Sequence, residues 1–127
     1  MYTFKKSERL SSKKAIEFLY TKGKAKNFFP LRIIVLKNKV ATPYPVRFMV
    51  SVPKKKFKRA VDRNRLKRLI REAWRLNKHI LYEQMKEKNL FADVMFLYTS
   101  NEKTDLKEIQ KKLPAVFNFV MGIISVD

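Results

Sequence analysis

The chain has 127 residues, of which 30 are lysine or arginine and 11 are aspartate or glutamate, so its formal net charge is +19. Hydrophobic residues make up 46% of the sequence, which is enough for a folded core and excludes a wholly disordered basic tail. This length predicts one domain over residues 1–127. A compact domain with so much like charge repels itself unless a polyanion neutralises it, so the expected partner is nucleic acid or an anionic membrane surface.

The membrane alternative is disfavoured, because the longest mostly apolar run covers only residues 115–124, AVFNFVMGII. A helix that spans a bilayer needs about 20 such residues. The opening MYTFKKSERL lacks the apolar core of a secretory signal. The sequence has no cysteine, so neither a disulfide nor a thiolate metal site is expected, and we expect a cytoplasmic location without a membrane partner.

Hydrophobic periodicity predicts a first helix within residues 7–23, SERLSSKKAIEFLYTKG. Ser11 or Ser12 is expected to cap it, and Gly23 is a suitable stop because glycine adopts the left-handed conformation easily. Strands are expected at residues 31–38, LRIIVLKN, and 46–52, VRFMVSV, on either side of a loop with two prolines. Because that loop can split or extend the first of them, we expect three strands before the central helix.

The central helix lies within residues 54–78, and Asp62 either caps it or favours its first turn. Residues 81–92, LYEQMKEKNLFA, continue in helical or irregular form. A clear strand, DVMFLYTS, follows at residues 93–100.

The last helical segment is expected at residues 104–125, with Thr104 or Asp105 as its cap. Pro114 should break or kink this helix, or begin a new one in its first turn. The order of all these elements indicates an α+β sandwich, in which helices pack on a mostly antiparallel sheet.

The central helix is expected to bury one side and expose the other, although it is highly basic. The apolar side holds Leu66, Leu69, Ile70 and Ala73, with Leu76 and Trp74 at its edges. The opposite side holds Asn64, Lys67, Arg68, Arg71 and Arg75, with Arg63 and Arg65 nearer the flanks.

A solvated surface is the ordinary explanation of such a charged side, but two features favour a polyanion site. Lys67–Arg71 and Arg71–Arg75 are like-charge pairs at i,i+4 spacing, which cost stability. Residues 51–75 hold 11 lysine or arginine residues against two acidic ones. Arginine suits phosphate because its planar fork binds two oxygens at once. Asn64 can hold a phosphate, a 2′-hydroxyl or a hydrated metal ion, or can be only a polar residue of the first turn.

No catalytic residue is predicted in this chain. Glycine occurs only at positions 23 and 122, so a glycine loop that cradles phosphate is excluded. His79 is the only histidine, which excludes a histidine metal cluster and a two-histidine nuclease. Asp62 and Glu72, the acids of the basic segment, point to different sides of the helix. The residues favour a binding subunit over a self-sufficient enzyme, and they leave open whether the protein itself binds a metal.

Residues 47–74, RFMVSVPKKKFKRAVDRNRLKRLIREAW, resemble the protein subunit of bacterial ribonuclease P. The family signature is a strand that ends in two lysines, a short loop, Ala-Val, one variable residue and then RNRxKRxxRE. The matching positions here are Lys54, Lys55, Ala60, Val61, Arg63, Asn64, Arg65, Lys67, Arg68, Arg71 and Glu72. The first helix is also similar to the opening of the family, with a leucine, two ring positions four apart and a final glycine.

The sequence departs from the family pattern in three places. The loop KKKFKRAV is one residue longer and lacks a glycine. The two ring positions are Ile16 and Tyr20, so one aromatic is missing, and the neighbouring strand has Arg32 and Ile34 in place of an apolar residue and a tyrosine. Base stacking, worth about 1–3 kcal/mol per base, is therefore expected to be smaller here or to use other rings. The available rings are Tyr20, Phe28 and Phe48.

The resemblance implies a single-domain α-β-β-β-α-β-α sandwich, similar to domain 2 of ribosomal protein S5. Its helices pack on a four-stranded sheet, and the central helix forms a left-handed crossover between parallel strands. Right-handed crossovers are the rule, so the residues alone do not predict this feature.

The resemblance also implies a function: the protein binds a large catalytic RNA, holds the single-stranded 5′ leader of precursor tRNA, and so assists removal of the leader. The RNA, with Mg²⁺, is expected to catalyse the hydrolysis, and no further protein partner is required. The expected contacts to the catalytic RNA are Lys54, Lys55, Lys56, Lys58, Arg59, Arg63, Asn64, Arg65, Lys67, Arg68, Arg71 and Arg75. The expected leader cleft, between the first helix and the sheet, consists of Ile16, Tyr20, Arg32, Ile34, Phe48 and Val50.

Two other functions share some of these features. A small ribosomal protein that binds rRNA has the same length and charge, and only the signature and a requirement in leader cleavage separate it from a ribonuclease P subunit. A DNA-binding helix-turn-helix needs two tightly linked helices, whereas strand and loop residues precede the central helix here.

Overall fold

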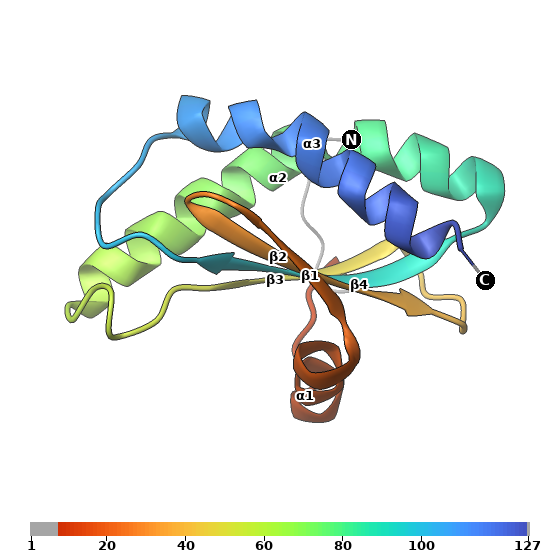
Figure 1. Ribbon diagram of the computed structural model, residues 1–127, viewed down its shortest axis with the longest axis horizontal. Coiled ribbons are helices and arrows are strands. Elements are labelled where there is room, and N and C mark those ends of the chain that lie inside the picture. Colours follow the sequence, from red (N-terminus) through yellow and green to blue (C-terminus); the bar gives the residue numbers. More distant parts are fainter. Residues whose placement is uncertain (1–7, 127) are drawn as a thin grey trace.

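Residues 8–126, the part of the chain that this computed structural model describes, form a four-stranded sheet with helices on both faces (Figure 1). The order of its elements, α-β-β-β-α-β-α, confirms the expected fold class and the number of strands before the central helix. The additional strand is not split from residues 31–38, however, but lies at residues 24–28. In chain order they are α1 (Lys13–Lys22), β1 (Lys24–Phe28), β2 (Leu31–Asn38), β3 (Val46–Ser51), α2 (Ala60–Lys88), β4 (Phe91–Tyr98) and α3 (Leu106–Ile124).

The strands lie in the order β1-β2-β4-β3. β2 is antiparallel to both β1 and β4, whereas β3 runs parallel to β4. Parallel strands require a crossover connection, and α2 provides it, as the family resemblance implied. The chain before α1 adds a bridge on β3, since Arg9 pairs with Phe48 and the Leu10 backbone N–H donates to the Phe48 carbonyl at 2.9 Å.

The main core lies between the sheet and the pair α2 and α3, which share one face (Figure 1). Its centre is aromatic: the Phe48 and Trp74 rings stack with centroids 4.4 Å apart, and Phe96 meets Phe48 edge-on at 4.9 Å. Trp74 is fully buried, so its ring removes a large apolar area from water. The contacts between the rings stabilise the core further.

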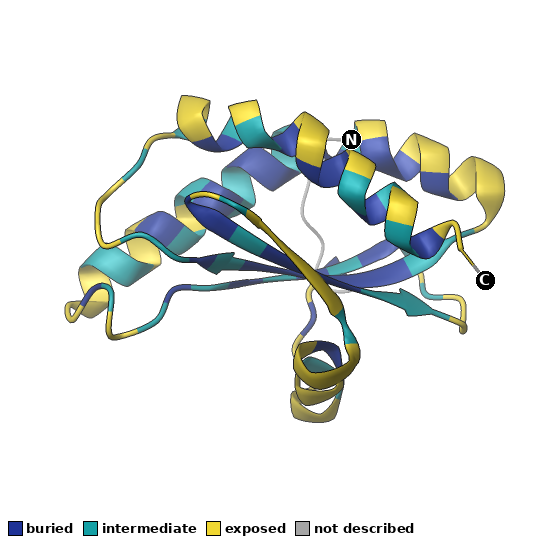
Figure 2. Cartoon of the chain, in the orientation of Figure 1, coloured by how far each residue is buried: buried dark blue, intermediate teal, exposed yellow. Residues whose placement is uncertain are grey.

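α1 lies alone on the opposite face of the sheet, where it covers a smaller aliphatic core (Figure 1). The buried residues there are Leu10, Leu19, Ile34 and Met95. Most of α1 is exposed, as Figure 2 shows by its colour. The sheet is therefore closed by two helices on one face and only partly covered on the other.

The helix ends agree with the sequence in part. The Ser12 side chain caps α1 by accepting from the Ala15 N–H at 3.4 Å, and the Asp105 side chain caps α3 by accepting from the Glu108 N–H at 2.9 Å. Asp62 lies in the first turn of α2 but does not cap it, because the N-cap position is Arg59, which makes no capping side-chain bond.

Gly23 follows the last residue of α1 as expected, but a left-handed conformation is not the reason. Its φ of −70° is not left-handed. A Cβ atom at this position would lie 2.5 Å from the Leu19 carbonyl oxygen and 2.7 Å from a methyl group of Ile34. Glycine is required here because the chain passes too close to α1 and β2 for any side chain.

Pro114 neither breaks the last helix nor begins a new one, because α3 is one helix with Pro114 inside it. A proline leaves the carbonyl group four residues earlier, here that of Gln110, without its helical donor. Pro114 is exposed, so water can reach this part of the helix, and the apolar side of α3 remains buried on both sides of the proline.

Candidate nucleic-acid interface

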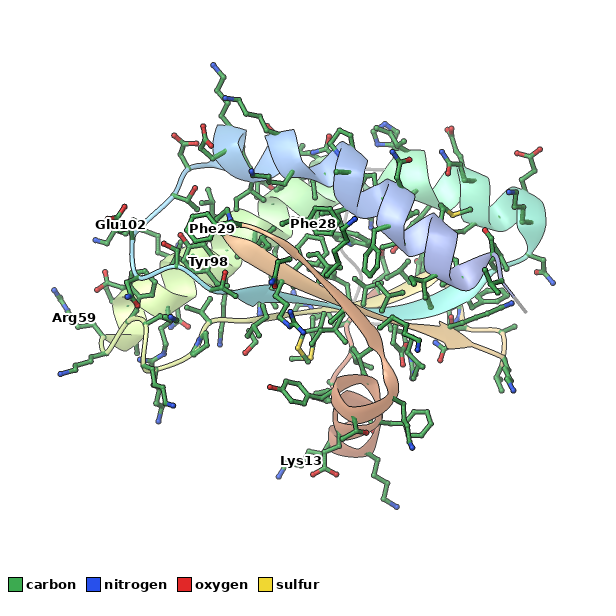
Figure 3. The ribbon with its side chains drawn as sticks, viewed as in Figure 1. Lys13, Phe28, Phe29, Arg59, Tyr98 and Glu102 are labelled. Carbon is green, nitrogen blue, oxygen red and sulfur yellow. The ribbon has the colours of Figure 1, made fainter. Side chains whose placement is uncertain are left out.

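The loop before α2 and the helix up to Arg75 carry every residue that the sequence assigned to the catalytic RNA, and none of these residues is buried. We call this set the basic surface. Its exposed members are Lys54, Lys55, Lys58, Arg59, Asn64, Arg65 and Arg68, and its half-buried members are Lys56, Arg63, Lys67, Arg71 and Arg75. Figure 3 shows Arg59 pointing away from the body of the protein at the end of the molecule.

The basic surface is held in place by the apolar side of the same helix. Leu66, Ile70, Ala73 and Trp74 are buried in the main core, as the helical wheel predicted. Their packing fixes the rotation of α2 about its axis, so the cations on the other side have defined directions. A rigid row of cations loses less conformational entropy on binding a polyanion than a flexible basic tail does.

Two contacts anchor the glycine-free loop, one to β4 and one to α2. Phe57 is buried and its ring lies 5.9 Å from that of Tyr98. The Arg63 guanidinium donates to the carbonyl groups of Phe57 at 2.9 Å and Lys58 at 2.8 Å. Arg63 thus orders the loop and contributes charge to the surface, and the anchoring role of Phe57 was missed from the sequence because the phenylalanine lies among lysines.

Further along α2, the arginines differ in their surroundings. The Arg75 guanidinium donates to Glu72 at 2.6 Å, and this hydrogen bond holds the pKa of the Glu72 carboxyl below its ordinary value. The pKa of Arg71 is lowered, first by its partial burial and then by the positive charge of Arg9. The positive charge of Arg71 is therefore less favourable here than in water.

A groove of about 660 Å³ follows this part of α2. Leu66 and Leu69 line it together with the arginines of the helix, and two other segments reach it with Arg9 and Lys103. The Lys103 ammonium group lies 3.5 Å from Asp62. Neither Arg9 nor Lys103 was expected at the site, because only the fold brings these residues beside α2.

The second expected site lies on the face of the sheet that α1 covers, which we call the α1 face. Tyr20 on α1 is 64% exposed, so its ring is available for stacking. Arg32 on β2 is half-buried and donates to the Asn27 side chain of β1 at 2.9 Å. Phe18, which is 56% exposed on α1, was not considered from the sequence.

Phe48 and Val50 were wrongly assigned to the cleft on this face. Side chains of a strand alternate between faces, and both residues belong to the main core against α2 and α3. Met49 lies between them and packs on the α1 side. Phe28 also lies on the other face, where its ring is 5.8 Å from that of Phe119, so Tyr20 is the one ring of the three suggested that the α1 face retains.

Two of the remaining cleft residues help to hold α1 against the sheet. Ile34 is 4% exposed and packs with Leu19 and Met95, and Ile16 is half-buried against the same group. Ile34 therefore positions the helix rather than offering open surface. Of the expected cleft residues, Tyr20 and Arg32 keep polar or aromatic groups within reach of solvent.

No group of three or more histidine, cysteine, aspartate or glutamate side chains suited to a metal ion occurs among residues 8–126. Within the same range, no helix is long and apolar enough to cross a bilayer. The apolar run at residues 115–124 instead forms the second half of α3, where it packs on the sheet.

These observations define a class of protein: a small α+β domain with a cationic surface on a rigid helix and a second, partly uncovered sheet face. Both features suit a polyanion that has ordered and single-stranded parts.

Comparison with known proteins identifies the family. The model of the ribonuclease P family matches residues 4–120. The ribonuclease P protein component of Porphyromonas gingivalis is 39% identical over 108 residues, which cover 85% of this chain and 79% of the relative. That of Chlorobaculum tepidum is 44% identical over 79 residues, which cover 60% of this chain and 51% of the relative.

Solved structures agree. The RNase P protein of Staphylococcus aureus matches with a TM-score of 0.65 and 25% identity over 90% of this chain and 95% of that one. The RNase P protein of Thermotoga maritima has the same fold, with a TM-score of 0.70 and 21% identity over 88% of this chain and 96% of that one. The chain belongs to the family of bacterial ribonuclease P protein components. Membership implies a subunit of a ribonuclease with a role in tRNA 5′ processing and a partnership with the RNase P RNA.

Proposed function

We propose that this protein binds the RNase P RNA through the basic surface and the 5′ leader of precursor tRNA through the α1 face. The RNA, assisted by Mg²⁺, then hydrolyses the phosphodiester bond that joins the leader to the tRNA. The proposed place of action is the cytoplasm, and no further protein is required.

The observation that supports this proposal most is the position of the family signature. Its arginines and lysines lie on the open side of α2, while the other side of the helix is fixed in the core by Trp74. A structured RNA presents phosphates at set distances, and a rigid row of guanidinium forks can match them. Binding of this kind releases counterions and therefore weakens steeply as the salt concentration rises.

The α1 face supports the leader-binding part of the proposal. A single strand binds to cations that track its backbone and to rings on which its bases stack. Tyr20 offers an exposed ring, and Arg32 offers a cation on the neighbouring strand of the sheet. With one aromatic replaced by Ile16 and the tyrosine of the strand replaced by Ile34, this face relies less on stacking.

The catalytic groups are proposed to belong to the RNA. His79, the single histidine, is half-buried on α2 away from the basic loop, and the acids of the basic segment are already paired. Asp62 lies beside Lys103, and Glu72 accepts from Arg75. The protein's own contribution is to bind, to orient the leader and to screen the repulsion between two RNAs.

Reconstitution tests the proposal. The protein is mixed with the RNase P RNA of its organism at low Mg²⁺, and removal of the leader from a precursor tRNA is followed over time. We expect strong stimulation over the RNA alone. No stimulation, with tight binding to structured RNA intact, would reject the proposal and favour the ribosomal alternative.

A variant pair then locates the contact. Arg65→Gln with Arg68→Gln removes two exposed charges from the basic surface, and Lys86→Gln with Lys88→Gln removes two exposed charges from the far end of α2. We expect the first pair to lower the slope of log K against log salt by about two and the control pair to leave it unchanged. Equal slopes for both pairs would show that RNA binding is only a response to total charge.

A further inference from the structure

Residues 8–10 pass around the edge of β3 and are anchored on both faces of the sheet. Glu8 is fully buried on the α2 side, where its carboxylate accepts from the Tyr82 hydroxyl at 2.6 Å and from the Lys78 ammonium group. Leu10 is buried on the α1 side and donates its N–H to the Phe48 carbonyl. The two anchors leave little freedom to the residue between them.

That residue is Arg9, and its side chain is exposed. It lines the same groove as Arg68, Arg71 and Arg75, although it belongs to a different element. The groove thus extends from α2 to the edge of β3, the position where the chain turns toward the α1 face.

Arg9 and Arg71 come close enough for their charges to interact. The charge of Arg9 contributes to the lowered pKa of Arg71, after the larger effect of partial burial. A buried ion pair and a backbone hydrogen bond hold this repulsive arrangement in place. Two guanidinium groups held near each other repel, and a phosphate that accepts from both forks would offset this repulsion.

We propose that Arg9 and Arg71 form one phosphate-binding site, at which the RNase P RNA crosses from α2 to the edge of β3. This inference rests on the proposed function, since it extends the basic surface of that proposal to a second element. Glu8 and Lys78 are positioning residues for the site, because they fix the segment that carries Arg9.

A double-mutant cycle tests the site. Arg9→Gln, Arg71→Gln and the double variant are compared with the wild-type protein for affinity to the RNase P RNA over a range of salt concentrations. We expect each single variant to lower the salt slope by about one and the affinity by about tenfold. The double variant should lose less than the product of the two single losses, because the two side chains share a ligand.

Lys86→Gln is the matched control, since it removes one exposed charge from the far end of α2. Arg9→Lys adds a second test: it should restore the salt slope but not the full affinity, because an ammonium group lacks the planar fork. Arg9 is exposed, so neither variant should lower the thermal midpoint below that of the wild type.

The outcomes separate the two proposals. If the wild-type protein binds the RNase P RNA no better than an unrelated structured RNA, the proposed function fails. If the wild type discriminates and Arg71→Gln weakens binding, but Arg9→Gln behaves like Lys86→Gln, only the two-arginine site fails. If Arg9→Gln leaves binding to the RNase P RNA intact and impairs only substrates with a long leader, the site contacts the leader, and the assignment to the catalytic RNA is wrong.

Discussion

Against α2 and α3 the sheet buries the largest side chains of the protein, whereas against α1 it buries a small aliphatic group. Trp74, Phe48, Phe96 and Tyr98 are at most 1% exposed on the first face. On the second face Arg32 and Met49 remain half-buried, and Tyr20 is largely exposed. Because two helices and an aromatic core stabilise one face, the other can keep surface that is suitable for a ligand.

The largest effect should come from the centre of the closed face. Trp74→Ala removes a fully buried ring that stacks on Phe48, and we expect it to lower the free energy of unfolding by about 3–5 kcal/mol. Ile16→Ala, at a half-buried residue on the inner side of α1, should lower it by about 1 kcal/mol. Urea unfolding measures both. Similar losses would mean that the two faces contribute alike to stability.

The segment that joins the two faces gives the next effect. Lys78→Met removes the cationic partner of the fully buried Glu8 carboxylate, and we expect a loss of about 3 kcal/mol in the free energy of unfolding. Glu8→Gln with Lys78→Met removes both charges and should recover part of this loss. A Lys78→Met protein as stable as the wild type would show that Glu8 is not held as a buried carboxylate.

The pH dependence of stability tests the buried contact between Tyr82 and Glu8. Burial raises the pKa of Tyr82, and the hydrogen bond to Glu8 raises it further. The raised pKa of the folded state means that this stabilisation is complete below about pH 10, where the unfolded tyrosine is still protonated, and is lost as the pH rises above that value.

Tyr82→Phe should be less stable at neutral pH, because the hydrogen bond to Glu8 is lost. Above about pH 10 its stability should fall less steeply than that of the wild type, by about 1.4 kcal/mol per pH unit. Tyr20→Phe is the control, since its side chain is exposed. Parallel curves for Tyr82→Phe and the wild type would mean that the folded state admits the ionised ring.

Much of the fold could be predicted, because hydrophobic periodicity reports burial directly. The apolar side of α2 and the strand character of β2, β3 and β4 followed from it. β1 was not found as a separate strand, because KAKNF is mostly exposed and has no β-branched residue. This strand forms through pairing with β2 rather than through its own preference.

The candidate site was predictable only where its residues lie close together in the sequence. The basic surface comes from one continuous segment, so the signature located it. Phe48 and Val50 were assigned to the wrong face, although the alternation of Val46, Phe48 and Val50 with Arg47 and Met49 contained the information. The contact of Glu8 with Lys78 joins residues 70 apart, so no local pattern predicts that Arg9 lies beside α2.

A leader-length series shows whether the basic surface and the α1 face serve two different RNAs. Cleavage by the reconstituted enzyme is measured with Arg65→Gln/Arg68→Gln and with Tyr20→Ala, on precursors with long and minimal leaders. We expect a higher concentration of the Arg65→Gln/Arg68→Gln protein to be needed to saturate the RNase P RNA, and this increase should be the same with both substrates. Tyr20→Ala should bind the RNA normally and lose about 1–3 kcal/mol of affinity for the long-leader substrate alone. If both variants impair both substrates equally, the two surfaces do not act separately, and the assignment of one RNA to each surface is wrong.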